Sequence, residues 1–441
     1  MWSLFLMLVS TKLISTFEPP HQPLSGTSAS SDKDASNLLF VITSNGMNWT
    51  QKQLVRALEG WASSFVVPVL TGRLQTMAGM AFYGVAGLGL HNFTVGASEL
   101  VPEVGNALHL RMSGISGTAR ADWLLIHKLM SDKGSFELSV SDAALSTTLV
   151  VRRQTGGHPA LELQHCSAMI GHVGLRFFGD GSWLYNLLKR FISAFIDNKL
   201  EKEVCHALQG YMSNDLQRVM QFLPLSTPIP NTSIVFDYAL VAEPRVVART
   251  FQFPLKGSFP SLDPGSVQPT HTHNWTQSLP PELNRMMYVA VSESFMNSAA
   301  RAFYQAGLMK WTMDWDALPQ SLTSTLKHTL PKAHNSPLSF QLSFDTPPIF
   351  SASESGLSSV LNGTMSVLNR ESDLLFSLHL HCQIKDGPQG VLLHSVMNYS
   401  MQYLNSPLII PVIGHVHLMR PTVTSGDGFV LVGLDLEEEE L

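Results

Sequence analysis

One apolar stripe, inside the stretch Pro159–Pro224, sets what this chain can fold into. The stretch opens with the alternating run 160–166, whose period of two is typical of a half-buried strand. After a segment punctuated by glycines the period lengthens, and apolar residues recur every three to five positions over 184–223. Ser182 is a suitable N-cap and Pro224 a suitable stop, so the pattern predicts one helix of 42 residues, about 63 Å long.

A helix of that length needs an equally elongated partner to bury its stripe. Cys166 lies in the alternating strand and Cys205 in the predicted helix, 39 residues further on. A disulfide between them could link the strand to the helix, and it would contribute about 4 kcal/mol through chain entropy. The third cysteine, Cys382, is then expected to be a buried free thiol or an intermolecular link. We therefore predict an elongated sheet clamped along an amphipathic helix.

Length and charge set further limits. A chain of 441 residues is too long for one ordinary core, which favours two domains. Only 14% of the residues are charged and 44% are hydrophobic, so broad apolar surfaces must be covered. The formal net charge of −6 divides into +2 over 37–230, −7 over 231–441 and −1 before them, which gives no support for nucleic-acid binding. The run Glu437–Glu440 is expected to be a solvated end.

The first 36 residues are expected to lie outside the fold. Residues 1–17 are mostly apolar but too short to span a membrane, and we interpret them as a secretory signal peptide. Lys12 interrupts this run, and the alternative is a frayed apolar N-terminus. Residues 18–36 are rich in Ser, Pro and Thr and are predicted to be a disordered spacer. No later segment reaches 18 apolar residues, so the sequence predicts no transmembrane helix and an extracellular protein. Six sequons favour secretion with N-glycosylation: Asn48, Asn92, Asn231, Asn274, Asn362 and Asn398.

Residues 37–223 are predicted to form a first domain. Leu38–Thr43 is typical of a short strand, and a helix is predicted over Trp49–Val67. We expect Thr71–Arg73 to turn the chain, and 74–151 to form an antiparallel meander, because short apolar runs alternate there with glycines and polar turns.

A proline-rich linker, 224–232, leads to a second predicted domain, 233–441. Its helices are expected over Ser294–Tyr304, ended by Gly307, and over Val391–Leu404. Its strands are expected over 234–240, 250–253, 287–291, 338–344, 364–368, 374–384, 413–418 and 429–434. The second half therefore repeats the order of the first, strands followed by a helix late in the domain.

Short motifs in a fixed order carry a resemblance to a known family. They are Ile42-Thr43-x-x-Gly46, Pro68-x-x-Thr71-Gly72, Gly157-His158-Pro159 before Cys166, Trp183-Leu184-x-Asn186-Leu187, Asp237-Tyr238-x-Leu240-Val241-x-x-Pro244, Asn284-x-Met286-Met287-Tyr288, Asn297-x-Ala299 and Gly307. With this order and the cysteine spacing, the chain resembles the secreted lipid-binding family of bactericidal permeability-increasing protein and lipopolysaccharide-binding protein. The resemblance covers most of the chain after Asn37.

The resemblance implies an α+β fold shaped as an elongated two-domain boomerang. Each domain would be a twisted antiparallel β-barrel wrapped on a long amphipathic helix, and a central sheet would join the two. Each barrel of the family holds a phospholipid in an apolar pocket that faces the central sheet. By similarity, the N-terminal pocket would be lined by Leu54, Leu58, Trp61, Leu188, Phe191 and Phe195.

The chain departs from the family in three places. The lipopolysaccharide-binding members carry lysine and arginine clusters at the tip of the N-terminal barrel, but Arg73 is the only cation here in the matching stretch Val69–Leu90. A Ser-rich spacer replaces a short mature N-terminus. The second half looks shorter by about 40 residues between Ile384 and Pro411, so its barrel is expected to lack one or two strands.

Motifs for other chemistry are weak. Residues 114–117 miss the G-x-S-x-G spacing of a hydrolase by one position, and Gly84-x-x-Gly87-x-Gly89 lies among strands and not at a strand-to-helix turn. His379-x-His381-Cys382 could offer a metal two histidines on one strand face, but no further ligand is visible nearby on that face, which favours ordinary strand residues over a metal site. The cation pairs Arg152-Arg153 and Lys189-Arg190 could contact lipid headgroups, although a solvated face is favoured.

These observations predict a secreted, glycosylated, non-enzymatic protein that binds phospholipid or lipopolysaccharide without a cofactor or metal. Acyl chains would lie between helix and sheet, and peripheral contact with a membrane or a bacterial surface is expected. One alternative is an innate-immune antibacterial protein that binds Gram-negative lipopolysaccharide. An alternative of another class is a degenerate scaffold whose pockets are filled by side chains and which acts through protein contacts.

Overall fold

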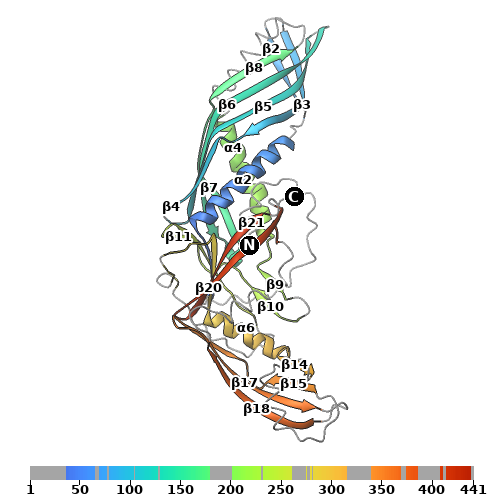
Figure 1. The fold of residues 1–441 in the computed structure, drawn as a ribbon. Helices are drawn as coiled ribbons and strands as arrows, with labels where there is room; N and C mark the ends of the chain where they lie inside the picture. The colour runs from blue at the N-terminus through green and yellow to red at the C-terminus, as the bar shows by residue number, and fades with distance from the viewer. Residues whose placement is uncertain are drawn as a thin grey trace.

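The structure is a computed structural model, and its described residues form three large sheets and one two-stranded sheet along an elongated, curved body (Figure 1). The residues that it describes are 36–64, 69–76, 79–103, 105–127, 130–178, 201–229, 232–260, 275, 279–280, 282–314, 339–368, 374–385, 408–410 and 414–438. Within them strands dominate and helices are few, so the α+β class predicted from the sequence is confirmed.

The N-terminal sheet has seven antiparallel strands in the described part of the chain, and it curls around helices (Figure 1). Hydrogen bonds run along β2-β3-β5-β6-β7, while β4 pairs with β5 and β8 pairs with β6. The strands are β2 Leu70–Thr76, β3 Gly79–Thr94, β4 Ala97–Glu103, β5 Ala107–His127, β6 Met130–Arg153, β7 Pro159–Met169 and β8 His172–Phe178. The predicted meander is present, but β8 was not predicted. The turn predicted at Thr71–Arg73 is wrong, because these residues pair with β3 as part of β2.

Helix α2 (Ser44–Ser64) lies on the concave face of this sheet and starts five residues before the predicted position. The cause is Thr43, whose Oγ1 accepts the N–H of Gly46 at 3.3 Å and donates to the carbonyl of Arg285 at 2.7 Å. Thr43 therefore caps the helix and fixes it to the central sheet at the same time.

The long predicted helix is described from residue 201 onward, and this part is not one regular α-helix. It consists of α4 (Glu201–Tyr211), a π-helical turn η5 (Met212–Leu216) and α5 (Gln217–Gln221), and it ends before Pro224 as predicted. Its predicted start at Ser182 lies outside the described residues.

The central sheet runs in the order β11-β12-β1-β13-β21-β20-β19. Its strands are β1 Leu38–Ile42, β11 Arg245–Val247, β12 Thr250–Leu255, β13 Met287–Ser292, β19 Leu408–Ile410, β20 Gly414–Gly426 and β21 Phe429–Glu438. β1 pairs with β12 on one side and with β13 on the other, so the first described strand lies inside a sheet built from the second half. Both faces of β1 are covered, which explains its unbroken apolar sequence. Glu437 and Glu438 pair with β20, so these two residues of the predicted solvated end belong to a strand, and the side chain of Glu437 is exposed as expected. In a small two-stranded sheet, β9 (Ser226–Pro228) lies inside the predicted linker and pairs with β10 (Val235–Asp237), which lies inside the strand predicted over 234–240.

The C-terminal sheet lies beyond α6 (Glu293–Gln305), the predicted helix that Gly307 follows (Figure 1). Its strands are β14 Lys310–Asp314, β15 Ser339–Phe344, β16 Ile349–Ser353, β17 Gly356–Leu368 and β18 Leu374–Lys385. β14 and β16 were not predicted. The helix predicted over Val391–Leu404 lies outside the described residues.

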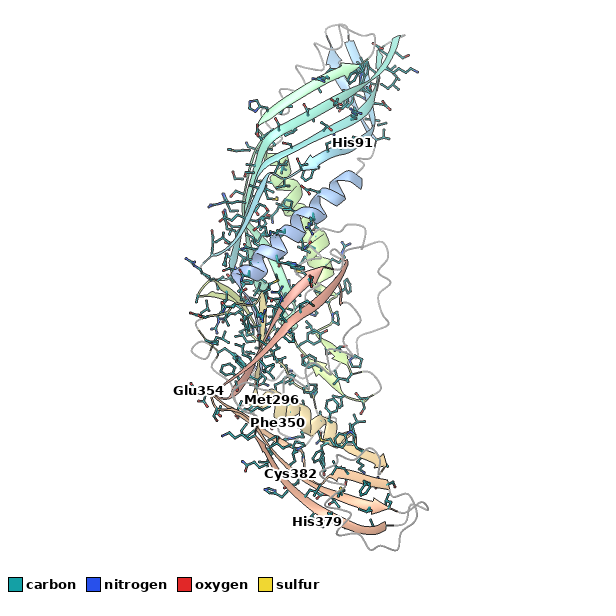
Figure 2. The ribbon with its side chains drawn as sticks, viewed as in Figure 1. His91, Met296, Phe350, Glu354, His379 and Cys382 are labelled. Carbon is teal, nitrogen blue, oxygen red and sulfur yellow. A yellow bond between two sulfur atoms is a disulfide. The ribbon has the colours of Figure 1, made fainter. Side chains whose placement is uncertain are left out.

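Asn297 of α6 takes the place of a neighbouring strand beside β16. Its Nδ2 donates to the carbonyl of Phe350 at 3.0 Å, and the N–H of Phe350 donates to its Oδ1 at 2.8 Å (Phe350 is labelled in Figure 2). One turn earlier on the same helix, Glu293 accepts the N–H of Ala352. Two side chains of one helix face therefore satisfy the backbone edge of β16.

Replacing Asn297 by Leu is expected to destabilise this contact by about 2 kcal/mol, because the N–H and carbonyl of Phe350 lose both partners. Hydrogen exchange of the Phe350 amide measures the effect and should become faster. Asn297→Asp is the matched variant, since its carboxylate still accepts this N–H and should keep most of the protection. Unchanged exchange in Asn297→Leu would contradict the assignment.

Candidate functional site

A continuous apolar layer separates the helices from the sheets in the N-terminal half. We call it the helix–sheet layer. Its buried side chains come from β1, α2, β4 to β7, η5, α5 and β12: Ile42, Met47, Leu100, Leu108, Leu110, Met112, Leu149, Val151, Leu161, Met212, Leu216, Met220 and Phe251. Leu54, Leu163, Leu208 and Phe253 are among the partly buried side chains packed against them. The layer therefore joins the concave face of the N-terminal sheet to one face of the central sheet.

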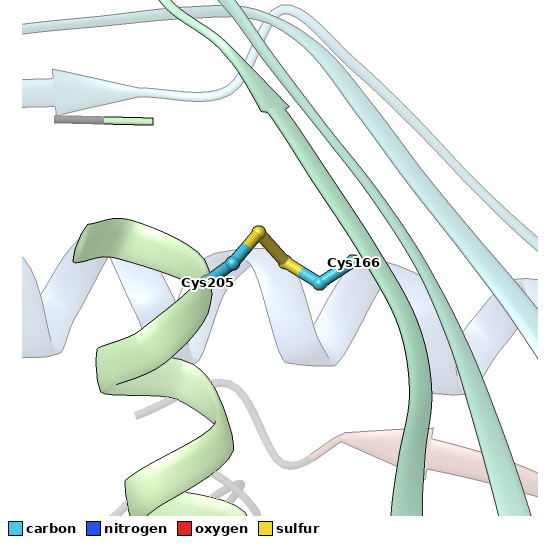
Figure 3. Close-up of a disulfide and its surroundings, with 2 residues drawn as sticks. All are labelled: Cys166 and Cys205. Atoms are coloured by element: carbon cyan, nitrogen blue, oxygen red, sulfur yellow. A yellow bond between two sulfur atoms is a disulfide. The ribbon is translucent and has the colours of Figure 1, made fainter. Parts of the chain in front are cut away.

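A disulfide fixes one side of this layer. Cys166 on β7 and Cys205 on α4 are bonded, with an S–S distance of 2.01 Å and a Cα–Cα distance of 5.7 Å (Figure 3). The bond joins the sheet to the helix, because each cysteine lies on one of the two elements that enclose the layer.

Side-chain hydrogen bonds fix the other helix. Gln51 of α2 accepts the N–H of Leu100 at 3.1 Å and donates to the carbonyl of Ser98, both on β4. Glu59, two turns later, accepts the N–H of Val95 at 3.0 Å. α2 thus satisfies backbone groups of β4 and of Val95 just before it, and the apolar side of the helix is held over the sheet.

The structure describes only part of the pocket that the resemblance implies. Leu54 is half-buried and packs against the helix–sheet layer. The side chains of Leu58 and Trp61, and all of Leu188, Phe191 and Phe195, lie outside what the structure describes. That pocket therefore stays a prediction. The sheet side of the layer was not singled out from the sequence, although the alternation 108–110–112 in β5 is the signal that would have found it.

His158 lies where β7 begins, next to the end of α5. Burial lowers the pKa of His158 below its ordinary value, and a hydrogen bond to the backbone of Met220 opposes that shift in part. Its Nδ1 is buried and has no hydrogen-bond partner among the residues that the structure describes. The fold therefore favours the neutral imidazole, because a proton on Nδ1 would have no acceptor.

Acid is expected to weaken the junction at His158. The folded-state pKa lies below the unfolded value of 6.5, so the unfolded chain binds more protons as the pH falls from about 6.5 to the folded pKa. The free energy of unfolding should fall across that window and level off below it. In His158→Gln, which cannot be protonated, this fall should be smaller. Urea denaturation at a series of pH values measures it, and equal pH dependence in the two proteins would contradict the assignment.

On the outer face of the N-terminal sheet, a serine, a histidine and a glutamate lie next to one another in the order of a hydrolase triad. Nε2 of His109 lies 3.1 Å from Oγ of Ser146, and its Nδ1 lies 3.3 Å from a carboxylate oxygen of Glu103. Nδ1 also lies 3.0 Å from the hydroxyl of Thr148. Ser146 pairs in register with β5 and β7, so its own backbone is used by the sheet and does not provide an oxyanion hole. The row is a cross-strand polar network.

The remaining candidate residues have defined surroundings where they are described. The thiol of Cys382 is free and exposed on β18, so the expectation of a buried thiol is wrong (Figure 2). It lies on the side of the edge strand opposite His379 and His381. His379 Nδ1 lies 3.1 Å from the hydroxyl of Thr364, and His381 Nδ1 lies 2.6 Å from Oδ1 of Asn362. No group of three potential metal ligands occurs within the described part of the chain.

The first of the two cation pairs, Arg152 and Arg153, is used within the fold. Arg152 forms an ion pair with Glu162 at 2.7 Å, and Nε of Arg153 donates to the carbonyl of Leu240 at 2.6 Å. Arg153 thus joins the N-terminal sheet to the segment before the central sheet, which leaves it unavailable to a lipid headgroup. Lys189 and Arg190 lie outside the described residues.

The sequons remain predictions. Asn48 is exposed on α2, and Asn92 is exposed on β3 with a φ of 51°. Asn362 is half-buried and bonded to His381. The other sequons, Asn231, Asn274 and Asn398, lie outside the described residues. Among the helices that the structure describes, none is long and apolar enough to cross a membrane.

The chain matches two models of one family. Residues 48–219 match the N-terminal domain of the LBP / BPI / CETP family, and residues 229–383 match its C-terminal domain. Lipopolysaccharide-binding protein of Rattus norvegicus is 29% identical over 279 residues, which cover 63% of this chain and 57% of the rat protein. Phospholipid transfer protein of Mus musculus is 23% identical over 340 residues, which cover 74% of this chain and 66% of the mouse protein. The match thus spans little more than half the length of the rat protein.

A solved structure shows the same architecture. The crystal structure of lipopolysaccharide binding protein aligns with 92% of this chain and 100% of its own, with a TM-score of 0.53 and 20% sequence identity. At this identity the likeness concerns the fold alone. It confirms the predicted two-domain arrangement of sheets and amphipathic helices around a central sheet.

Proposed function

Because the chain belongs to the LBP / BPI / CETP family, we propose that it is a secreted, non-enzymatic protein that holds the acyl chains of phospholipid or lipopolysaccharide between helix and sheet. The helix–sheet layer carries the proposal. It brings apolar side chains from helices and two sheets against one another along the concave side of the N-terminal half. Relatives named for lipopolysaccharide binding and for phospholipid transfer support lipid as the ligand class.

The driving force would be hydrophobic. Burying an acyl chain gains about 0.8 kcal/mol for each CH2 group removed from water. A lipid entering the layer would part the helices from the sheet, and the Cys166–Cys205 bond would limit how far α4 can move from β7. The headgroup would stay near solvent, since charged groups are costly to bury in such a layer.

Uptake of a fluorescent phosphatidylethanolamine by the purified protein tests this function. Leu54→Asp places a charge against the helix–sheet layer and should weaken uptake by about tenfold or more. Lys52→Asp is the matched control, because Lys52 is exposed on the same helix and its replacement should leave uptake unchanged. Thermal melts of both variants show whether the fold is retained. Equal uptake by a folded Leu54→Asp protein would count against the proposal.

The rival within the family is recognition of Gram-negative lipopolysaccharide through its phosphate groups. Capture of phosphates by cations weakens as salt rises, whereas acyl-chain burial does not. The described part of the stretch 69–90 offers Arg73 as its single cation, so we expect binding to depend only weakly on salt. A steep loss of lipopolysaccharide binding between low and high salt would favour the rival. Absence of any lipid binding would favour the scaffold alternative.

A further inference from the structure

Strand β18 of the C-terminal sheet has one free side. β17 pairs with it along its length, and within the described part of the chain no strand pairs with its other side. Residues 377–379 and 381–385 are all exposed, so both faces of the strand meet solvent. We call its regular part, residues 376–385, the β18 edge. It lies at the outer margin of the sheet, towards one end of the elongated body (Figure 1).

Other edges of this sheet are protected, and the β18 edge is not. The backbone edge of β16 is satisfied by Asn297 and Glu293 of α6. β14 has only five residues and begins with the exposed Lys310. The β18 edge is longer, contains no proline, and carries its one lysine, Lys385, at its last position. Proteins that stay monomeric protect a free edge with charges, prolines or a short strand, so this edge has the features of one that accepts another strand.

The apolar face of the sheet continues onto the β18 edge. Met365 of β17 is 7% exposed, whereas its cross-strand partner Leu378 is 36% exposed. On the same face of β18, Ile384 is 38% exposed and the thiol of Cys382 is exposed. Another strand beside β18 would cover these side chains, because cross-strand neighbours on one face lie in contact.

The opposite face of β18 is polar. Nδ1 of His381 lies 2.6 Å from Oδ1 of Asn362 on β17. The carboxylate of Asp345 accepts the hydroxyl of Thr364 on β17 at 3.0 Å, one strand in from the edge, and lies 3.9 Å from Nδ1 of His379. Residues 376–384 themselves contain no Asp, Glu, Lys or Arg. Charge on the edge therefore does not oppose a contact between two copies, although each chain carries a net charge of −6.

We propose that two copies of this chain pair antiparallel through their β18 edges, which joins their C-terminal sheets into one. A second copy fits this edge because a two-fold axis perpendicular to the sheet places apolar side chains opposite apolar ones and polar opposite polar. The same contact gives both free edges a partner. An axis through Leu380 or His381 pairs the greatest length, 376–384 or 377–385 of each copy. The contact lies outside the helix–sheet layer and needs no lipid, so it goes beyond the proposed function.

Sedimentation velocity of the full chain tests the pairing. The protein is deglycosylated with an enzyme first, because the sequon Asn362 lies one strand from the contact. The wild-type protein should form a dimer as its concentration rises. Ser377→Lys with Gln383→Lys changes two exposed side chains of the polar face. In either register each new lysine at 377 lies opposite a lysine, the new one at 383 or the partner's Lys385. Dimerisation should weaken about tenfold or more.

Ser377→Glu with Gln383→Lys is the matched variant. It changes the same two positions but places the glutamate opposite a lysine in either register, so the dimer should be retained. Net charge alone predicts the reverse order. The two lysines reduce the overall charge of −6 and hence the general repulsion between copies, whereas the glutamate–lysine variant leaves that charge unchanged. Far-ultraviolet circular dichroism shows whether both variants keep the fold.

Cross-linking with a flexible bismaleimide gives a second readout. In the two registers the Cys382 thiols of the copies lie about 8–14 Å apart, within reach of such a reagent. Cys382→Ser should lose the cross-link and still sediment as a dimer.

Three results would overturn the proposal: a wild-type protein that stays monomeric, equal dimerisation of Ser377→Lys, Gln383→Lys, or an equal loss in both double variants. Lipid uptake should be the same in the wild-type protein and in both double variants. This readout separates failure of the β18 contact from failure of the proposed function.

Discussion

Replacing Cys166 and Cys205 together by alanine is expected to lower the free energy of unfolding of the N-terminal half by about 4 kcal/mol. The bond closes a loop of 39 residues, and opening it returns that chain entropy to the unfolded state. Urea denaturation followed by far-ultraviolet circular dichroism measures the loss. Because the bond also limits separation of α4 from β7, lipid uptake should become faster and retention weaker in the same variant.

Cys382→Ser is the control for this experiment. Its thiol is free and exposed, so the substitution should change the free energy of unfolding by no more than about 0.5 kcal/mol. A small loss in Cys166→Ala, Cys205→Ala, similar to that of Cys382→Ser, would show that the helix is held to the sheet by packing alone.

Gly46→Ala is expected to be the most damaging single substitution in α2, at a cost of about 3 kcal/mol or more. A Cβ at Gly46 would overlap the backbone carbonyl oxygen of Met286 and lie 3.0 Å from Cγ2 of Ile42. Neither neighbour can move freely, because Met286 also accepts the N–H of Thr43 at 3.1 Å and is held by Asp435 through its own N–H at 3.0 Å. Thermal denaturation measures the loss.

Gly60→Ala, in the same helix, is expected to raise the free energy of unfolding, whereas Gly46→Ala lowers it. A Cβ at Gly60 meets no atom within 4 Å, so only the gain in helix propensity remains. That variant should be more stable by about 0.5–1 kcal/mol. If both glycine variants were equally destabilised, the close approach of α2 to the central sheet would not explain why position 46 requires glycine.

The short motifs recognised in the sequence mark joints between parts of the fold. Thr43 and Gly46 fix α2 to the backbone beside β13, as described above. Gly157, with a φ of +89°, accepts the N–H of Leu240 at 3.0 Å, and a Cβ there would lie 2.8 Å from that of Ala239. Two motifs far apart in sequence, 157–159 and 237–240, therefore meet. Their order was visible in the sequence, but their contacts were not, because nothing local specifies a partner about 80 residues away.

Strands of the meander could be predicted because one face is buried and the other is not, which leaves alternation in the sequence. β16 escaped prediction for a physical reason. β16 is short, and its edge is completed by Asn297 and Glu293 of α6, so its pattern does not reveal its partners. The position of β1 inside a sheet of the second half was equally invisible, since a continuous apolar run specifies burial on both faces but not the neighbours.

The sequence contains a signal for the π-helical turn, in the spacing of its apolar residues. Apolar residues at 204, 208, 212, 216 and 220 recur every four positions, and in an α-helix each step of four rotates the side chain by about 40°. A wider turn at Met212–Leu216 corrects part of that rotation. It keeps Met212, Leu216 and Met220 buried in the helix–sheet layer.

The central claim is that apolar chains of lipid are held between helix and sheet. Mass spectrometry of the folded protein, purified from a secretory host without added lipid and then extracted with organic solvent, tests it most directly. We expect phospholipid or lipopolysaccharide in near-stoichiometric amount, lost in parallel with the fold when the protein is denatured. A folded protein with the Cys166–Cys205 bond intact and no extractable lipid would contradict it.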